Sequence, residues 1–100
     1  MQLQVHSVHF DADHKLLDFI KTKVNKLEQF HDQIIGTEVF LRLDKSTSNE
    51  NKVAEIKLAV PGKDLFAKKQ SKSFEEATDA SVEALRKQIR RYKTKLQDRK

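Results

Sequence analysis

A single long helical pattern, from Ser73 to Lys100, constrains the fold of this chain more than any other stretch. Apolar side chains recur there at alternating spacings of four and three residues, which places them on one stripe of an α-helix. The members of this stripe are Thr78, Val82, Leu85, Ile89, Tyr92 and Leu96. Ser73 and Glu76 form a capping-box pattern, and no proline or glycine follows them. We therefore predict one long helix that buries one face.

The outward face of this helix changes sign along its length. Acidic residues from Glu75 to Glu83 occupy the first half. Residues 86–100 carry eight positive charges and one negative charge, and since the whole chain has a net charge of +5, the other 85 residues sum to −2. Such faces are usually solvated surface, and one or two bases in the last turn are enough to complement the helix dipole. Because these bases extend over about four turns, the pattern favours a surface that binds a polyanion.

The preceding residues alternate between strand and helix patterns. A short strand runs from Leu3 to about Val8, and a second amphipathic helix covers about His14 to Phe30, preceded by carboxylates at 11–13 that can cap it. Three strands follow at 38–43, 54–60 and 65–71, separated by a polar loop at 46–51 and by a Pro61-Gly62 turn suited to type II geometry. The last strand is rich in lysine, which suits the edge of a sheet.

This order, β-α-β-β-β-α, limits the topology. Helix one connects strand one to strand two, and a crossover of this kind favours a parallel pair of strands. Strands two to four then form an antiparallel meander. Each helix has a single apolar stripe, so both helices should cover the same face of the sheet. We predict an α+β two-layer sandwich, a four-stranded mixed sheet with two helices on one face, similar to a double-stranded-RNA-binding domain. Residues 1–100 should form a single domain.

Composition argues against several function classes. Cysteine is absent, which excludes disulfides, thiolate metal ligands and cysteine nucleophiles, and two glycines are too few for a glycine-rich phosphate loop. The four histidines, His6, His9, His14 and His31, lack the spacing of a helical metal motif. We expect no enzymatic activity, no cofactor, no metal and no small-molecule substrate. No segment has the pattern of a signal peptide or a membrane span, so we expect a cytoplasmic protein with no membrane partner.

Three stretches resemble a known family. The opening Met1-Gln2-Leu3-Gln4-Val5 matches its first strand, and Lys26-Leu27-Glu28-Gln29-Phe30 matches the Lys-Leu-Glu-x-aromatic end of its first helix. The leucine, glutamine and basic pattern from Leu85 to Leu96 matches its second helix. On these stretches the chain resembles the ribosome hibernation-promoting factors and the related ribosome-associated inhibitor, in their short form.

The resemblance implies a ribosome hibernation factor. Such proteins occupy the channel between the head and body of the small ribosomal subunit, overlap the tRNA sites and the mRNA path, and inhibit translation under stress or in stationary phase. The implied partners are 16S-type rRNA and neighbouring ribosomal proteins, with a monomer off the ribosome. The rRNA-binding residues that it implies are Lys23, Lys26, Lys87, Arg91, Lys93 and Lys95, to which the charge pattern adds Arg86 and Arg90. Lysine and arginine bind phosphates irrespective of sequence, and structured RNA is recognised largely by shape.

Two other function classes stay open. A general RNA- or DNA-binding module of similar topology would use the same basic helix, but it would bind bare duplex, whereas a ribosome factor would sediment with the small subunit. A regulator of other proteins would instead use the open face of the sheet, where Phe40 and Phe66 point outward. Aromatic residues on such a face commonly pair across strands, which is the plainer interpretation of these two side chains.

Overall fold

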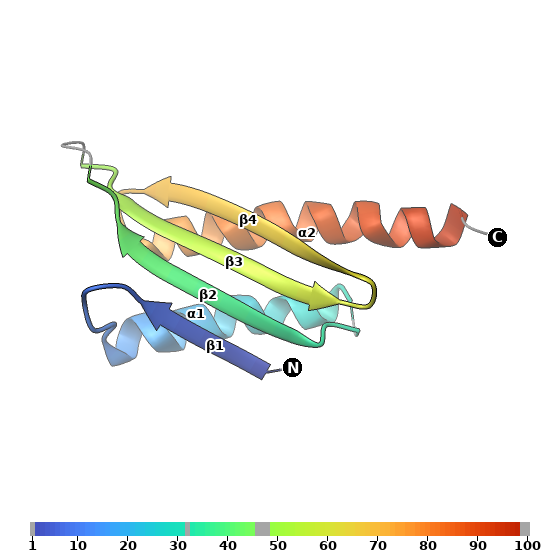
Figure 1. Cartoon of the computed structure of the whole chain (residues 1–100), viewed down its shortest axis with the longest axis horizontal. Coiled ribbons are helices and arrows are strands. Elements are labelled where there is room, and N and C mark those ends of the chain that lie inside the picture. The colour runs from blue at the N-terminus through green and yellow to red at the C-terminus, as the bar shows by residue number, and fades with distance from the viewer. Residues whose placement is uncertain (1, 32, 46–48, 99–100) are drawn as a thin grey trace.

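The elements of the fold follow the predicted order. The computed structural model describes residues 2–31, 33–45 and 49–98, with side chains as far as residue 94. The elements are β1 (Gln2–Ser7), α1 (His14–Asn25), a 3-10 helix η1 (Lys26–Gln29), β2 (Gly36–Leu43), β3 (Lys52–Val60), β4 (Lys63–Ser71) and α2 (Phe74–Asp98). In Figure 1 the sheet lies in front of both helices, which run side by side in the same direction. The expected polar loop lies partly, and Arg99 and Lys100 lie wholly, outside the described residues.

The sheet has the predicted mixed topology. Its strand order is β1-β2-β3-β4. β1 is parallel to β2, since the chain crosses over through α1 and η1 between them, and the other two pairs are antiparallel. The lysine-rich β4 is an edge strand, as expected, and β1 forms the opposite edge.

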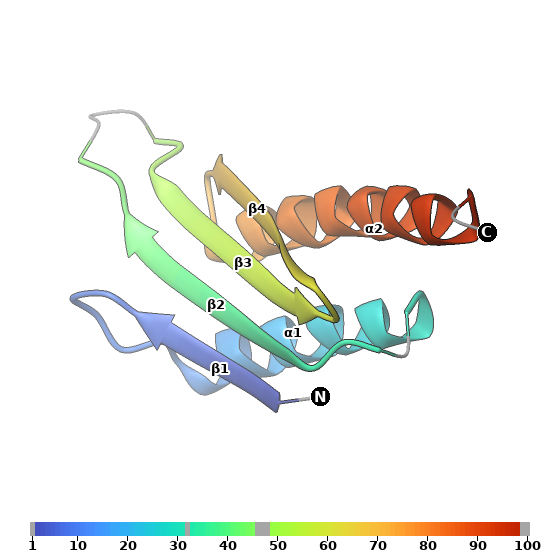
Figure 2. The same cartoon turned by 45° about the vertical axis from the view of Figure 1, so that its right-hand side comes forward.

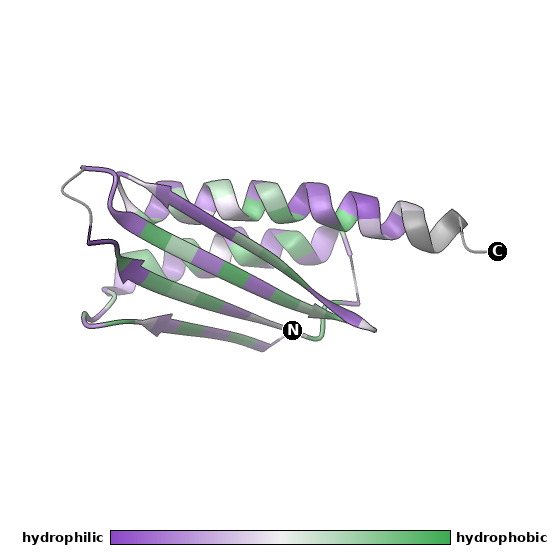
Figure 3. Ribbon diagram, turned by 45° about the horizontal axis from the view of Figure 1, so that its top comes forward, coloured by the Kyte–Doolittle hydropathy of each residue, from purple (hydrophilic) through white to green (hydrophobic). Residues whose placement is uncertain are grey.

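Alternation along the strands separates a buried face from an open one (Figure 3). In β2, Val39 and Leu41 are completely buried, while Phe40 and Arg42 between them keep part of their surface exposed. Val39 is in register with Ile56 of β3, which is also completely buried. Period-two patterning therefore directs one set of side chains to the helices and leaves the other set uncovered.

The two helices begin at side-chain caps. The Asp13 carboxylate accepts a hydrogen bond from the Leu16 N–H at 2.8 Å, and the Ser73 hydroxyl accepts one from the Glu76 N–H at 3.1 Å. The predicted end of helix one at Phe30 is wrong. The α-helix ends at Asn25, and the chain tightens into η1, where the Phe30 N–H donates to the Leu27 carbonyl at 3.1 Å. Leu27 stays buried in the core, while Phe30 lies at the surface.

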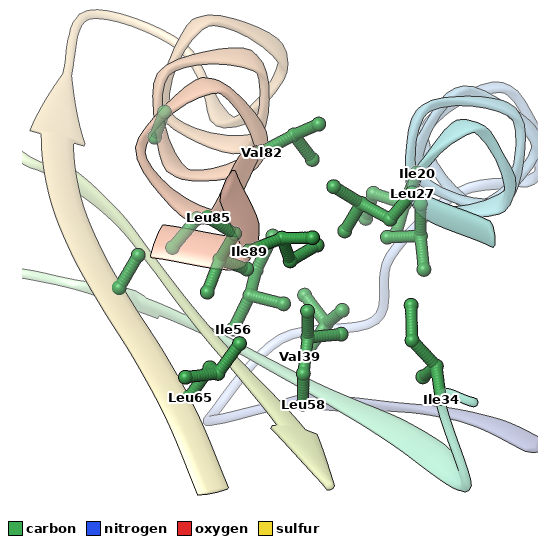
Figure 4. Packing of buried hydrophobic residues seen from close by; sticks show 14 of the residues in the cluster. Ile20, Leu27, Ile34, Val39, Ile56, Leu58, Leu65, Val82, Leu85 and Ile89 are labelled. Carbon is green, nitrogen blue, oxygen red and sulfur yellow. The ribbon is translucent and has the colours of Figure 1, made fainter. Parts of the chain in front are cut away.

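One core lies between the helices and the sheet. Figure 4 shows Val82 and Ile89 of α2 pointing toward Ile20 of α1 and Leu27 of η1, while Leu85 points toward the strands. Leu85, Ile20 and Leu27 are completely buried. The Ser81 hydroxyl, also buried, donates to the Ala54 carbonyl of β3 at 3.1 Å and so fixes α2 over the centre of the sheet.

Three side chains attach the second half of α2 to the rest of the molecule. Gln88 Nε2 donates to the Phe66 carbonyl of β4 at 2.7 Å, and the Tyr92 hydroxyl donates to the Pro61 carbonyl at 3.0 Å. Lys93 Nζ donates to the Phe30 carbonyl at 2.9 Å. Past these contacts the end of α2 extends beyond the turn between β3 and β4 (Figures 1 and 2). Gly62 in that turn has φ +84°, as the type II expectation requires.

Candidate nucleic-acid interface

The cationic side chains of α2 lie on its outer side, as the helical spacing predicts. The name basic surface is used here for Arg86, Lys87, Arg90, Arg91 and Lys93. Arg86 is partly buried and the other four are exposed. Lys95, also predicted as a binding residue, has a side chain outside the described part of the chain.

The basic surface has one side toward β4. A shallow groove of about 460 Å³ lies there, with Ala80 and Ala84 among its lining residues. Lys87 and Arg91 line it together with Lys69 of β4. Sequence reasoning assigned Lys69 only to an edge strand. The sequence did not predict that Lys69 adds a positive charge from β4 to the groove beside α2. The packing of α2 beside β4 is a tertiary feature, and no local pattern indicates it.

The other side of the basic surface faces η1. Here Arg86, Arg90 and Lys93 line a hollow of about 250 Å³ together with Phe30, which keeps 38% of its surface exposed. The Arg86 guanidinium carbon lies 5.8 Å from the centre of the Phe30 ring, within cation–π range. Sequence reasoning placed Phe30 at the flank of a helical stripe and gave it no role at the site.

Most charges of the basic surface are uncompensated. Arg86 is the exception, since its Nε lies 3.1 Å from both carboxylate oxygens of Glu83. This hydrogen bond lowers the pKa of Glu83 and raises the pKa of Arg86. Within residues 2–31, 33–45 and 49–94, no ion pair is formed by Lys87, Arg90, Arg91 or Lys93. The local field is therefore strongly positive.

The two lysines predicted on helix one occupy different environments. Lys23 Nζ lies 3.1 Å from the Asp79 carboxylate and 5.5 Å from the centre of the Phe19 ring. It joins α1 to the acidic half of α2, roughly 10 Å along the helix axis before Arg86 at 1.5 Å per residue. Lys26 is exposed on η1, the element that packs beside α2 through Leu27. The structure therefore does not bring Lys23 to the basic surface.

The open face of the sheet has a different electrostatic character, because its charges are paired. Glu55 accepts from Arg42 and lies 3.9 Å from Lys68, and Lys57 lies 3.7 Å from Asp64. Phe40 stacks on His6 of β1, with ring centres 4.9 Å apart.

The two aromatic residues of this face do not form the cross-strand pair that the sequence suggested. Phe66 is in register with Lys57, one row away from Phe40 and His6, and 50% of its surface is exposed. The face thus offers neither a cluster of aromatic rings nor an excess of charge.

The described part of the chain has neither a metal-binding cluster nor a membrane-spanning helix. Among the side chains described in residues 2–31, 33–45 and 49–94, no three of His, Cys, Asp or Glu are close enough to hold a metal ion. None of the helices in those ranges combines the length and apolar character needed to cross a bilayer.

A two-layer α+β sandwich with an uncompensated cationic helix defines a class of small proteins whose surface is complementary to polyanions. Within that class, the chain belongs to the Sigma 54 modulation protein / S30EA ribosomal protein family, whose sequence profile matches residues 3–97.

Individual relatives share most of the length of the chain. It is 29% identical over 96 residues to a ribosome hibernation promoting factor of Klebsiella oxytoca, covering 96% of this chain and 97% of the relative. A ribosomal subunit interface protein of Coxiella burnetii has a similar solved structure, with a TM-score of 0.84, 19% identity and coverage of 94% and 99%. The N-terminal domain of Thermus thermophilus Protein Y gives a TM-score of 0.79, 20% identity and coverage of 92% and 99%. These solved structures support the fold.

Proposed function

We propose that this protein is a ribosome hibernation factor that binds the small ribosomal subunit in the tRNA and mRNA channel and inhibits translation under stress or in stationary phase. Membership of the S30EA family and the name of the Klebsiella relative support this function. The structural observation that carries it is the uncompensated basic surface of α2. As a single domain acting in the cytoplasm, the chain would need no cofactor and no catalytic step.

The physical basis of binding is phosphate neutralisation. Each lysine or arginine that meets a phosphate releases condensed counterions, so affinity rises with the number of contacts and falls with salt. Rigid α2 holds these charges in fixed positions, and structured RNA is recognised through the positions of its phosphates and 2′-hydroxyls. The protein, when bound in this channel, would exclude tRNA and mRNA by occupying the space that they need.

Sedimentation with purified ribosomal subunits tests the proposal. We expect the protein to pellet with the small subunit at low and moderate salt and to reduce synthesis in a reconstituted translation reaction. Pelleting with the large subunit alone, or no pelleting even at low salt, would contradict the proposed function.

A general structured-RNA-binding module is the second candidate. It is favoured by the chemistry of the basic surface, where lysine and arginine bind phosphates without reading sequence. A competition experiment separates the two. An excess of bare RNA duplex should leave the protein on the small subunit if the ribosome is its target, and should remove it if any structured RNA suffices.

A further inference from the structure

We infer that the hollow beside Phe30 receives one unstacked nucleobase of a single-stranded RNA segment. We name this hollow the base pocket. Its lining residues are Phe30, Arg86, Ile89, Arg90, Lys93 and Thr94. The inference deepens the proposed function, on which its ribosomal setting rests, by adding a stacking contact to a surface otherwise suited to phosphates.

The aromatic ring of the base pocket is held in place before any ligand arrives. Lys93 Nζ donates to the Phe30 carbonyl at 2.9 Å, which ties the end of η1 to α2. The Arg86 guanidinium lies over the Phe30 ring, and the hydrogen bonds that its Nε and Nη2 donate to the Glu83 carboxylate fix its orientation. A planar ligand therefore meets two flat groups, a phenyl ring and a guanidinium, that are already ordered.

The size and lining of the base pocket suit a single planar ring. Pockets for drug-sized ligands measure about 300–1,000 Å³, whereas this hollow measures about 250 Å³. The apolar part consists of the Phe30 ring and Ile89, which is 1% exposed. Arg90 and Lys93 lie among the same lining residues and offer positive charge to the phosphates on either side of a bound base.

Charge and chemistry together favour a nucleobase over other occupants. Stacking on an aromatic ring and cation–π contact with arginine bind any base, because every base has a π face. Bases inside a duplex are stacked on their neighbours, so only an unstacked base presents that face. An acidic peptide would satisfy the positive charges, but it would leave the exposed surface of the Phe30 ring uncovered.

The first experiment uses the absence of tryptophan from this chain. A Phe30→Trp variant therefore carries a single tryptophan, located in the base pocket, whose fluorescence can be excited selectively over that of Tyr92. It is titrated with a short single-stranded oligoadenylate and with an abasic ribose-phosphate oligomer of the same length and charge. We expect quenching by the oligoadenylate and little change with the abasic oligomer. Equal responses to the two oligomers, or equal quenching by an oligoglutamate peptide, would overturn the inference.

The second experiment measures affinity with the native ring removed. Phe30→Leu keeps an apolar side chain but lacks a π face, so the affinity for oligoadenylate should fall by about 5- to 150-fold, the range of one base–aromatic stacking contact. The affinity for the abasic oligomer should not change. Phe66→Leu is the matched control, since Phe66 is an exposed phenylalanine on the open face of the sheet. Circular dichroism melting establishes that both variants fold.

The outcomes distinguish this inference from the proposed function. If the unsubstituted protein pellets with the small subunit but Phe30→Leu binds both oligomers as tightly as the parent, the base pocket is wrong and the hibernation proposal stands. If oligoadenylate is preferred through Phe30 but the protein does not pellet with the small subunit, the base pocket is right and the hibernation proposal is wrong.

Discussion

At the scale of single residues, some polar groups are buried at a cost in stability. Thr78 is completely buried in α2, and within the described part of the chain its hydroxyl has no hydrogen-bond partner. His31 is 7% exposed, packs edge-on against the Tyr92 ring at 5.4 Å, and its Nε2 also has no partner there. A buried polar group without a partner keeps its desolvation penalty, about 1–3 kcal/mol.

Replacing Thr78 with valine should therefore stabilise the protein. The Thr78→Val variant exchanges the hydroxyl for a methyl group at similar helix propensity, and we expect the free energy of unfolding to rise by about 1 kcal/mol. Chemical denaturation measures it. Thr94→Val is the control, because Thr94 is exposed and its hydroxyl donates to the Arg90 carbonyl at 3.0 Å. A loss of stability in Thr78→Val would mean that the hydroxyl has a partner.

The two lysines of helix one should differ in RNA binding. Lys26 is exposed, whereas Lys23 pairs with Asp79. Neutralising Lys26 by Lys26→Met should reduce the salt slope of log affinity for the small subunit by about one, and Lys23→Met should leave it nearly unchanged. Equal reductions would show that Lys23 leaves Asp79 to bind phosphate.

The sequence predicted the charged side chains of α2 better than it predicted the residues of other elements that lie beside them. The spacing of Lys87 and Arg91 was enough to predict that they point outward, because helix periodicity alone decides it. Phe30, Lys69 and the Lys23–Asp79 pair could not be predicted in the same way. Each depends on where a second element packs against α2, which no local pattern records.

At the scale of elements, the fold depends on α2 packing against both α1 and the sheet. Leu85 of α2 is completely buried in the common core. Leu85→Ala should lower the free energy of unfolding by about 2–5 kcal/mol, since it removes buried methyl groups and leaves a cavity. Leu43→Ala at the end of β2 is the matched control, because Leu43 is 51% exposed and its truncation should change stability by less than about 0.5 kcal/mol. Equal effects of the two truncations would exclude this arrangement.

Alternation predicted the strands and their faces well. Val39 and Leu41 had to share one face because the side-chain period of a strand is two, and the structure confirms it. The end of helix one was predicted wrongly because residues 26–30 have ordinary helical propensities. Nothing in them signals the change to 3-10 geometry, which accompanies burial of Leu27 in the shared core.

At the scale of the whole molecule, charge is distributed unevenly. The open face of the sheet balances its charges in pairs, while the basic surface does not. A double variant, Lys87→Glu with Arg91→Glu, should weaken binding to the small subunit strongly and lower the salt slope by about two, with little change in stability. If these bases only complemented the helix dipole, the variant would instead lose about 0.3–1 kcal/mol of stability per residue without a specific loss of binding.

A control with the same change in net charge separates location from total charge. Lys57→Glu with Lys68→Glu alters two lysines of the open face, which are 43% and 51% exposed at the side chain. We expect this variant to retain most of its affinity for the small subunit. Equal losses in the two double variants would mean that net charge alone drives binding and that the basic surface is not the site.

The extension of α2 beyond the sheet should produce a gradient of amide hydrogen exchange along one helix. Amides near Leu85 and Ile89 lie over the core and should open only with global unfolding, while those from residue 95 onward lie past the contacts of Gln88, Tyr92 and Lys93 and should exchange through local fraying. A bound polyanion would hold that end in place. We expect exchange from residue 95 onward to slow on binding to the small subunit, while exchange near Leu85 hardly changes. In one helix, the unchanged exchange near Leu85 would then serve as an internal reference, and the slowed exchange at the C-terminal end would report that the polyanion is bound.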